Sequence, residues 1–219
     1  MTTLQVFALD ALPDEPWRNG LGRTRTIATQ PRETLGDNAS DGVPWDWRVS
    51  VATLEGDAAF SRFPGVERTS VLLSPGSVTL HVEDRAHRLG RAGELISYPG
   101  DASTHATLDG EITTATRQAG LSLLNVMTRR GAASARVRAL QDSATLSAQA
   151  LAVLLVGGGW RAIEITPPNQ RCFDLLTGQG TWMGWSPNQP EPHRTARLQL
   201  ERLSPDGLLV AIEIDSTHG

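Results

Sequence analysis

Short stretches in which apolar and polar residues alternate recur through the chain, and glycine, proline or asparagine separates most of them. The clearest begins at Trp47, where apolar side chains take alternate positions with Arg48, Ser50 and Ala52. Alternation with period two is typical of a β-strand that buries one face. Further strands are predicted at residues 4–9, 24–28, 69–73, 78–83, 93–99, 112–117, 121–127, 151–156, 161–165, 172–176, 198–203 and 208–214.

This arrangement of strands predicts an all-β fold. Many short strands at intervals of roughly 8–12 residues, with few helical windows, indicate a sandwich or a barrel. The 219 residues form two strand-rich halves, which predict two related β-rolls in one domain, roughly residues 1–130 and 131–219, with exchange of strands between the halves allowed. The Ala/Ser-rich residues 131–149 are expected to form a crossover, and the polar residues 30–44 a surface excursion.

Composition argues against several classes of protein. The net charge of −4, with scattered Lys and Arg, offers no basic surface to nucleic acid. The N-terminal residues lack the basic and apolar regions of a signal peptide, and no apolar run approaches the ~20 residues that span a bilayer. We therefore expect a cytoplasmic protein with no membrane partner. Cys172 is the single cysteine, which excludes an internal disulfide, and its apolar neighbours predict that it is buried.

Two stretches carry part of the metal-binding signature of the cupins, β-barrels in which histidines and a carboxylate converge on one divalent ion. Residues 76–83 resemble the first cupin motif, but one histidine is missing and the spacing is one residue short. Residues 93–105 match the start of the second motif, with the histidine one position late. The ligand set is incomplete, so we expect no metal and no other cofactor. A metal site made by His81, Glu83 and His105 is the alternative.

Three sequence blocks together resemble the HutD/Ves family: PWRNGLGRTRTI at residues 16–27, WRVSVATLEGDAAFSRFPGVERTSVLL at residues 47–73 and LNVMTRR at residues 124–130. The first block departs from the family pattern at Leu21 and Thr26. The resemblance implies a bicupin of the RmlC-like type without a recognised metal. It also implies an association with histidine utilisation in HutD-type members, which are thought to bind a pathway metabolite such as N-formylglutamate or urocanate. Ves-type members are linked to stress and cold response.

The residues themselves indicate an anion-binding pocket. Arg48 and Ser50 share the polar face of their strand, and an arginine that lines the mouth of a roll can hold a carboxylate through charge-assisted hydrogen bonds. The alternative for Arg48 is an ordinary exposed position. Arg68, directly after a Pro-Gly turn, is a second candidate, and its alternative is an ion pair with an acidic neighbour, either Glu67, Glu55 or Asp57.

The remaining candidates are residues that we expect to contribute to the same pocket. Trp17 is either an apolar wall of the predicted pocket or a core residue. Asn125 interrupts an apolar strand, and a buried amide needs hydrogen-bond partners, so it is either a structural clamp or a ligand contact. Phe60 and Phe63 are expected to be core anchors rather than ligand contacts. The predicted ligand-binding residues are Trp17, Asn19, Gly20, Gly22, Thr24, Arg48, Ser50, Arg68 and Asn125, where the two glycines offer backbone amides.

The sequence contains no signature of catalysis. No G-x-S-x-G elbow occurs, and the five histidines form no recognisable arrangement with serine and aspartate. We therefore predict non-catalytic binding of a small carboxylate metabolite that senses or regulates histidine catabolism or a stress response, in a monomer or homodimer. A metal-dependent cupin dioxygenase or isomerase is the second hypothesis, and an interaction module that binds no small molecule is the third.

Overall fold

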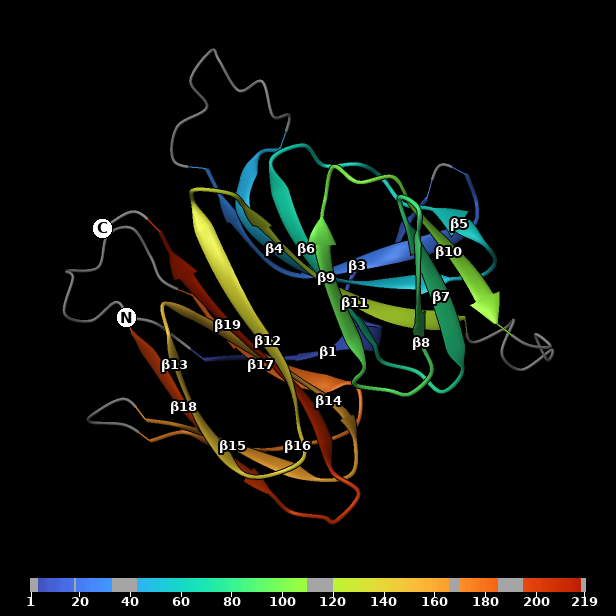
Figure 1. Ribbon diagram of the computed structural model, residues 1–219. Coiled ribbons are helices and arrows are strands. Elements are labelled where there is room, and N and C mark those ends of the chain that lie inside the picture. Colours follow the sequence, from blue (N-terminus) through green and yellow to red (C-terminus); the bar gives the residue numbers. More distant parts are fainter. Residues whose placement is uncertain are drawn as a thin grey trace. The chain divides into compact units, whose positions relative to one another are not determined.

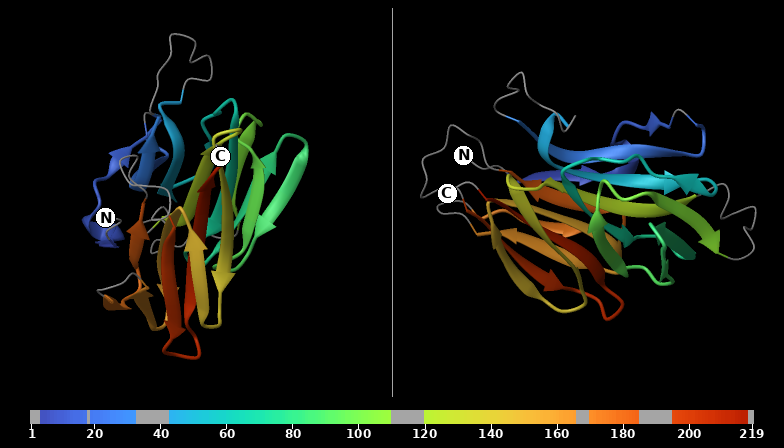
Figure 2. Two further views of the ribbon diagram at one scale, coloured as in Figure 1. Left: turned by 90° about the vertical axis from the view of Figure 1, so that its left-hand side faces the viewer. Right: turned by 45° about the horizontal axis from the view of Figure 1, so that its top comes forward.

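The computed structural model describes residues 4–17, 19–32, 43–109, 120–165, 170–184 and 195–217. These residues form β-strands joined by turns, together with one short 3-10 turn, η1 (Leu9–Ala11) (Figures 1 and 2). The chain divides into two compact units, which we call the first roll (residues 13–132) and the second roll (residues 1–12 and 133–219). None of the described residues belongs to a helix with the length and apolar character needed to cross a membrane.

The first roll contains two antiparallel sheets. The larger sheet has six strands in the spatial order β2 (Glu15–Pro16), β3 (Gly22–Pro31), β4 (Trp45–Leu54), β11 (Leu121–Arg129), β6 (Val66–Leu72) and β9 (Leu95–Pro99). The smaller sheet has the order β5 (Ala58–Ala59), β10 (Thr104–Asp109), β7 (Ser77–Val82) and β8 (Arg85–Leu89).

The second roll repeats this plan with five and four strands. Its larger sheet has the order β1 (Gln5–Ala8), β17 (Gln179–Met183), β14 (Ala150–Gly157), β19 (Leu208–Ser216) and β12 (Ala133–Leu140). The smaller sheet has the order β13 (Ala144–Ala148), β18 (Ala196–Arg202), β15 (Trp160–Glu164) and β16 (Cys172–Leu175). Figure 1 shows β1, in blue, among the orange and red strands of this roll, where it pairs with β17.

The interior of the first roll changes character along its strands. At one end, Leu54 on β4, Leu72 on β6 and Leu123 on β11 are fully buried and form one apolar cluster with residues of β7 and β10. Toward the other end of the same strands, the inward positions become polar, with Arg48 on β4 and Arg68 on β6. The apolar end supplies the packing that holds the sheets together, and the polar end is available for a site.

The described interior of the second roll is mostly apolar. Its core cluster contains leucine and valine side chains of β14, β18 and β19, and the indole of Trp160 on β15 is fully buried. Buried polar side chains are few in the described part of this roll, namely Glu164 and Thr181. The two rolls therefore share a layout of strands but differ in what fills it.

The all-β fold and most of the predicted strands are confirmed. The interpretation of residues 131–149 as a crossover is wrong, because β12 pairs along its whole length with β19 and β13 pairs with β18. Small Ala and Ser side chains concealed the pattern, although Leu146 and Ala148 are core residues. The strand predicted at residues 112–117 and most of the surface excursion at residues 30–44 lie outside the described residues.

Cys172 is exposed, which corrects the prediction that it is buried. It begins β16, the edge strand of its sheet, where no other described strand pairs with one side of it.

Candidate functional site

A cavity of about 520 Å³ lies within the first roll, at the polar end of β4, β6 and β11. Its volume falls in the range of roughly 300–1,000 Å³ that is usual for small-molecule sites. Seven of the nine predicted ligand-binding residues line it: Trp17, Asn19, Thr24, Arg48, Ser50, Arg68 and Asn125. The structure therefore brings together side chains from four separate parts of the sequence around one hollow. Whether they bind a ligand stays a prediction.

The register of the larger sheet explains why these side chains meet. Met127 on β11 pairs with Arg48 on β4 and with Arg68 on β6, so the two arginines flank one central residue. Two residues earlier on β11, Asn125 pairs in the same way with Ser50 and Ser70. Because residues two apart in a strand face the same side, both rows present their side chains to one face of the sheet.

Arg68 is the most unusual residue of the cavity, because its guanidinium is buried with no counter-charge among the residues that the structure describes. The residue is 5% exposed. Its Nη2 donates to the Ser61 carbonyl oxygen at 3.0 Å, and its Nε has no hydrogen-bond partner among the described residues. Three aromatic rings surround it at 5.2–5.9 Å from Cζ to ring centroid: Phe60, Phe63 and Tyr98. Ring faces attract a cation but do not neutralise it.

The expected ion pairs of Arg68 do not form. Glu67 instead pairs with Arg130 at 2.9 Å, and Glu55 pairs with Arg23. Asp57 accepts a hydrogen bond from the backbone N–H of Leu108 at 2.8 Å. That alternative is wrong. Burying a charge without a partner is costly, and no carboxylate of the described residues offsets that cost at Arg68.

Arg48 is more exposed to solvent than Arg68. Its side chain is 22% exposed, and Nη2 donates to Thr26 Oγ1 at 2.7 Å. The same nitrogen lies 3.6 Å from Glu15 Oε2. Arg48 is thus neither an ordinary exposed residue nor a free anion receptor, because a carboxylate of the chain already stands beside it.

Asn125 has the structural role that the sequence left open, and its role as a ligand contact stays a prediction. Ser70 Oγ donates to Asn125 Oδ1 at 2.8 Å and lies 3.0 Å from the Tyr98 hydroxyl. This chain of hydrogen bonds fixes the orientation of the amide. The NH2 group of Asn125 donates to no other described residue, and the residue lines the cavity, so this donor is available there.

Aromatic side chains form the apolar wall. Trp17 meets Phe60 edge to face, with ring centroids 6.3 Å apart, and its Nε1 donates to Thr24 Oγ1 at 2.8 Å. Phe60 and Phe63 pack against core clusters, as expected, but they also line the cavity, which corrects the view that they are core anchors alone.

Gly20 and Gly22 shape the loop and do not line the cavity. The N–H of Gly20 donates to the Trp17 carbonyl oxygen at 3.0 Å, so it is not free for a ligand, contrary to the prediction. At Gly22 a Cβ would lie 2.5 Å from the Thr53 carbonyl oxygen and 3.1 Å from the Trp17 ring. This glycine therefore permits the close approach of Trp17. Asn19 Oδ1 accepts from the backbone N–H of Leu21 within the same turn.

The alternative metal site is not assembled. His81 and His105 pair across β7 and β10 on the exposed face of the smaller sheet, away from the core. Glu83 Oε1 accepts from the backbone N–H of Ser103 at 2.6 Å. No group of three or more potential metal-ligating side chains occurs among the residues that the structure describes. These three residues therefore do not converge on one ion.

The sequence did not single out several lining residues. Met127 and Ser61 belong to the recognised blocks, and Met127 follows Asn125 at the spacing of one strand face, a signal that would have found it. Glu15 precedes the first block and lies on a two-residue strand, which is too short to show any periodicity.

The fold defines the class of protein. A cupin 2 conserved barrel domain protein from Leptotrichia buccalis superposes with a TM-score of 0.56 and 9% identity, covering 96% of each chain. Two rolls of this kind in one chain make a bicupin.

The comparison of sequences is more specific. The HutD family profile matches residues 9–184. Protein Ves of Citrobacter koseri is 33% identical over 205 residues, which cover 84% of this chain and 98% of that protein. HutD from Pseudomonas fluorescens SBW25 superposes with a TM-score of 0.71 and 16% identity, covering 98% and 99% of the two chains. The chain belongs to the HutD family.

Proposed function

We propose that the first roll binds a small carboxylate metabolite, and that the protein acts as a sensor or regulator without transforming its ligand. Ligands of the N-formylglutamate or urocanate type have the right chemistry, since the first carries two carboxylates and the second carries one, each on a compact polar body. Membership of the HutD family supports a link to histidine catabolism, and the likeness to Ves leaves a stress response as the second physiological setting.

One observation carries the proposal: the buried guanidinium of Arg68 has no carboxylate partner among the described residues. A carboxylate in the cavity would neutralise the charge of this guanidinium, since Arg68 lines the cavity. A charge-assisted hydrogen bond of this kind contributes about 1.5–3 kcal/mol. The Asn125 amide and the Ser50 hydroxyl supply neutral polar contacts nearby, and Trp17 and Phe60 supply an apolar wall.

The test is a titration of the purified protein with N-formylglutamate, urocanate, histidine and glutamate, read by calorimetry and by thermal unfolding. A ligand present at a hundred times its Kd should stabilise the fold by about 2.7 kcal/mol, which raises the Tm by roughly 5–10 °C. Arg68→Met should lower the affinity by at least about tenfold, because it removes the charge-assisted contacts.

Arg62→Met is the matched control. Arg62 belongs to the same corner as Arg68 but is exposed, and its Nε donates to the Asp101 carbonyl oxygen outside the cavity. The control should bind like the wild type. Wild-type affinity in Arg68→Met, or no response to any of the four compounds, would contradict the proposal.

A further inference from the structure

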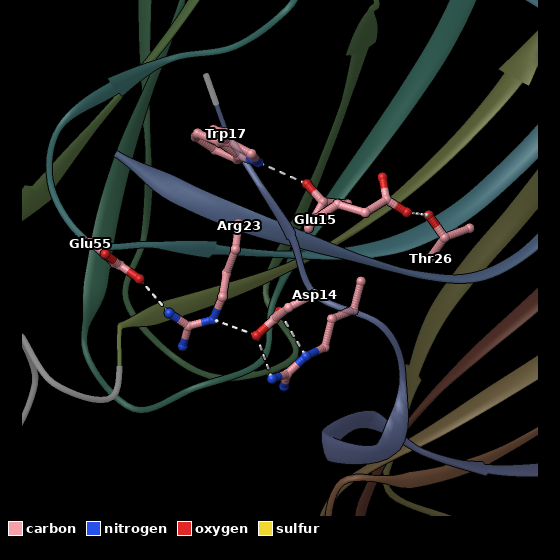
Figure 3. Close-up of polar contacts among 8 residues, drawn as sticks. Asp14, Glu15, Trp17, Arg23, Thr26 and Glu55 are labelled. Carbon is pink, nitrogen blue, oxygen red and sulfur yellow. Dashed lines mark hydrogen bonds and ion pairs between the residues drawn. The ribbon is translucent and has the colours of Figure 1, made fainter. Parts of the chain in front are cut away.

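Glu15 is the one acidic side chain among the described residues that line the cavity. Its Oε2 lies 3.6 Å from Nη2 of Arg48, and its Oε1 lies 3.4 Å from Thr26 Oγ1. Figure 3 shows this reach from Glu15 to Thr26. The outer arginine of the cavity therefore has a carboxylate of the chain beside it, whereas the inner arginine, Arg68, has none among the described residues.

The backbone on both sides of Glu15 is anchored. Asp14 forms a two-pronged ion pair with Arg25, with contacts of 2.9 and 3.0 Å, and it also lies 3.6 Å from Arg23 (Figure 3). On the other side, the N–H of Trp17 donates to the Gly22 carbonyl oxygen at 2.9 Å. Because the chain is held before and after Glu15, its backbone is fixed beside the cavity, and its side chain, 59% exposed, reaches Arg48 and Thr26 from there.

We propose that Glu15 is a specificity residue: it stands in for a ligand carboxylate at Arg48, so the cavity takes one external carboxylate, at Arg68. The opposite end of the ligand is then a neutral or cationic group that donates a hydrogen bond to Glu15. The class of ligand is a monocarboxylate with an N–H donor at its far end. This inference rests on the proposed function and narrows its ligands: urocanate, with one carboxylate and an imidazole N–H, fits, whereas N-formylglutamate, with two carboxylates, is disfavoured.

Charge explains the selection. Two guanidinium groups and one carboxylate leave the described lining with one net positive charge, which a single carboxylate neutralises. A second ligand carboxylate at Arg48 would stand next to that of Glu15, and like charges at such distances repel. Discrimination built on repulsion of the wrong ligand is a common means of specificity. An N–H group at the same place would find an acceptor in Glu15.

A matched pair of ligands tests this directly. N-formylglutamine and N-formylglutamate have nearly the same shape, but the first ends in a neutral amide with N–H donors and the second in another carboxylate. The wild type should bind N-formylglutamine at least about tenfold more tightly than N-formylglutamate, because the amide avoids one contact between like charges. Glu15→Gln should reduce that preference to within about threefold, mainly by improving the binding of N-formylglutamate.

Glu67→Gln is the control variant, because it makes the same change in net charge one residue from Arg68 but outside the lining, where Glu67 pairs with Arg130. It should keep the wild-type preference. The inference is overturned if the wild type binds N-formylglutamate as tightly as N-formylglutamine, or if Glu15→Gln leaves the preference unchanged. The proposed function is tested separately: it still holds when this preference is not found, provided that either compound binds and Arg68→Met abolishes that binding. Absence of binding by both compounds overturns the inference, and the four-compound titration then decides the function separately.

Discussion

The two rolls have similar sheets but differ in the side chains that fill their interiors. In the first roll, the inward positions of β4, β6 and β11 pass from leucines to Arg48, Ser50, Arg68 and Asn125, and a cavity of about 520 Å³ lies there. In the second roll, the inward positions of β14 and β18 are apolar and Trp160 is fully buried on β15, whose last inward position is taken by Glu164. Buried apolar area stabilises a fold, whereas a buried unpaired cation does not. We therefore expect the packing of the second roll to be the more sensitive to core substitutions, whereas the first roll carries the candidate site.

The largest effect is expected in the core of the second roll. Trp160→Ala should lower the free energy of unfolding by about 3–5 kcal/mol, because it removes a fully buried indole and leaves a cavity. Urea denaturation measures this change. Leu176→Ala, at a side chain that is 67% exposed in the same roll, should stay within about 0.5 kcal/mol of the wild type. A loss below about 1 kcal/mol for Trp160→Ala would remove the distinction between the rolls.

An intermediate effect is expected at the polar row of the first roll. Ser70→Ala should cost about 1–2 kcal/mol of unfolding free energy, since it leaves Asn125 Oδ1 without its donor in a buried place. The same variant frees the amide to rotate, so it should also weaken ligand binding. Thr69→Ala is the control, because Thr69 Oγ1 bonds to Ser97 Oγ at an exposed position of the same strand. Equal losses in both variants would show that the buried row has no special role.

Arg68→Met should change the stability of the ligand-free protein less. The variant loses the attraction to three rings but no longer buries an unpaired charge, so the two terms offset and the unfolding free energy stays within about 1 kcal/mol. Urea denaturation without ligand checks this. A loss of several kcal/mol of unfolding free energy would mean that Arg68 is a structural residue. The contrast drawn between the first roll and the second roll would then fail.

The smallest effect is expected on the surface of the second roll. A hydrogen bond from Arg161 lowers the pKa of the Asp174 carboxyl, whose Oδ1 lies 2.6 Å from Nε of that arginine. Because the pKa is lower in the folded state, the ion pair stabilises the fold above the unfolded pKa and ceases to do so as pH falls through the folded value. Asp174→Asn should lower the Tm by at most about 2 °C at pH 7, since the pair is exposed.

The difference between Asp174→Asn and the wild type should disappear in strongly acidic buffer, where both carry a neutral side chain. Thermal unfolding at a series of pH values measures it. A difference in Tm that persists or grows below the folded pKa of Asp174 would contradict the assignment of this effect to the carboxylate.

Alternation along single strands was enough to predict much of the site. It placed Arg48 and Ser50 on one face of β4, and the break in an apolar run marked Asn125. The partners of these residues depend on the register between strands, which no local pattern encodes, so Ser70 and Tyr98 were not found. Register is set by the whole sheet and by its turns.

The failures have similar physical causes. Glu15 contacts Arg48 from a two-residue strand, where no periodicity can exist. Residues 131–149 lack large apolar side chains, although β12 and β13 are formed by pairing with strands much later in the chain. The ion pairs expected for Arg68 were reasonable by sequence distance, but alternate residues of a strand face opposite sides, and Glu67 therefore points away from it.

The pairing of β1 with β17 has a consequence for the order of folding. Residues 5–8 join residues 179–182, so the second roll cannot complete its larger sheet until nearly the whole chain has been synthesised. The described strands of the first roll all come from residues 13–132, so its sheets can form before the rest of the chain is synthesised. Closing a long loop costs entropy before its contacts are gained, which slows folding. The first roll, which carries the candidate site, is therefore expected to form first on the ribosome, and the second roll is expected to be completed last.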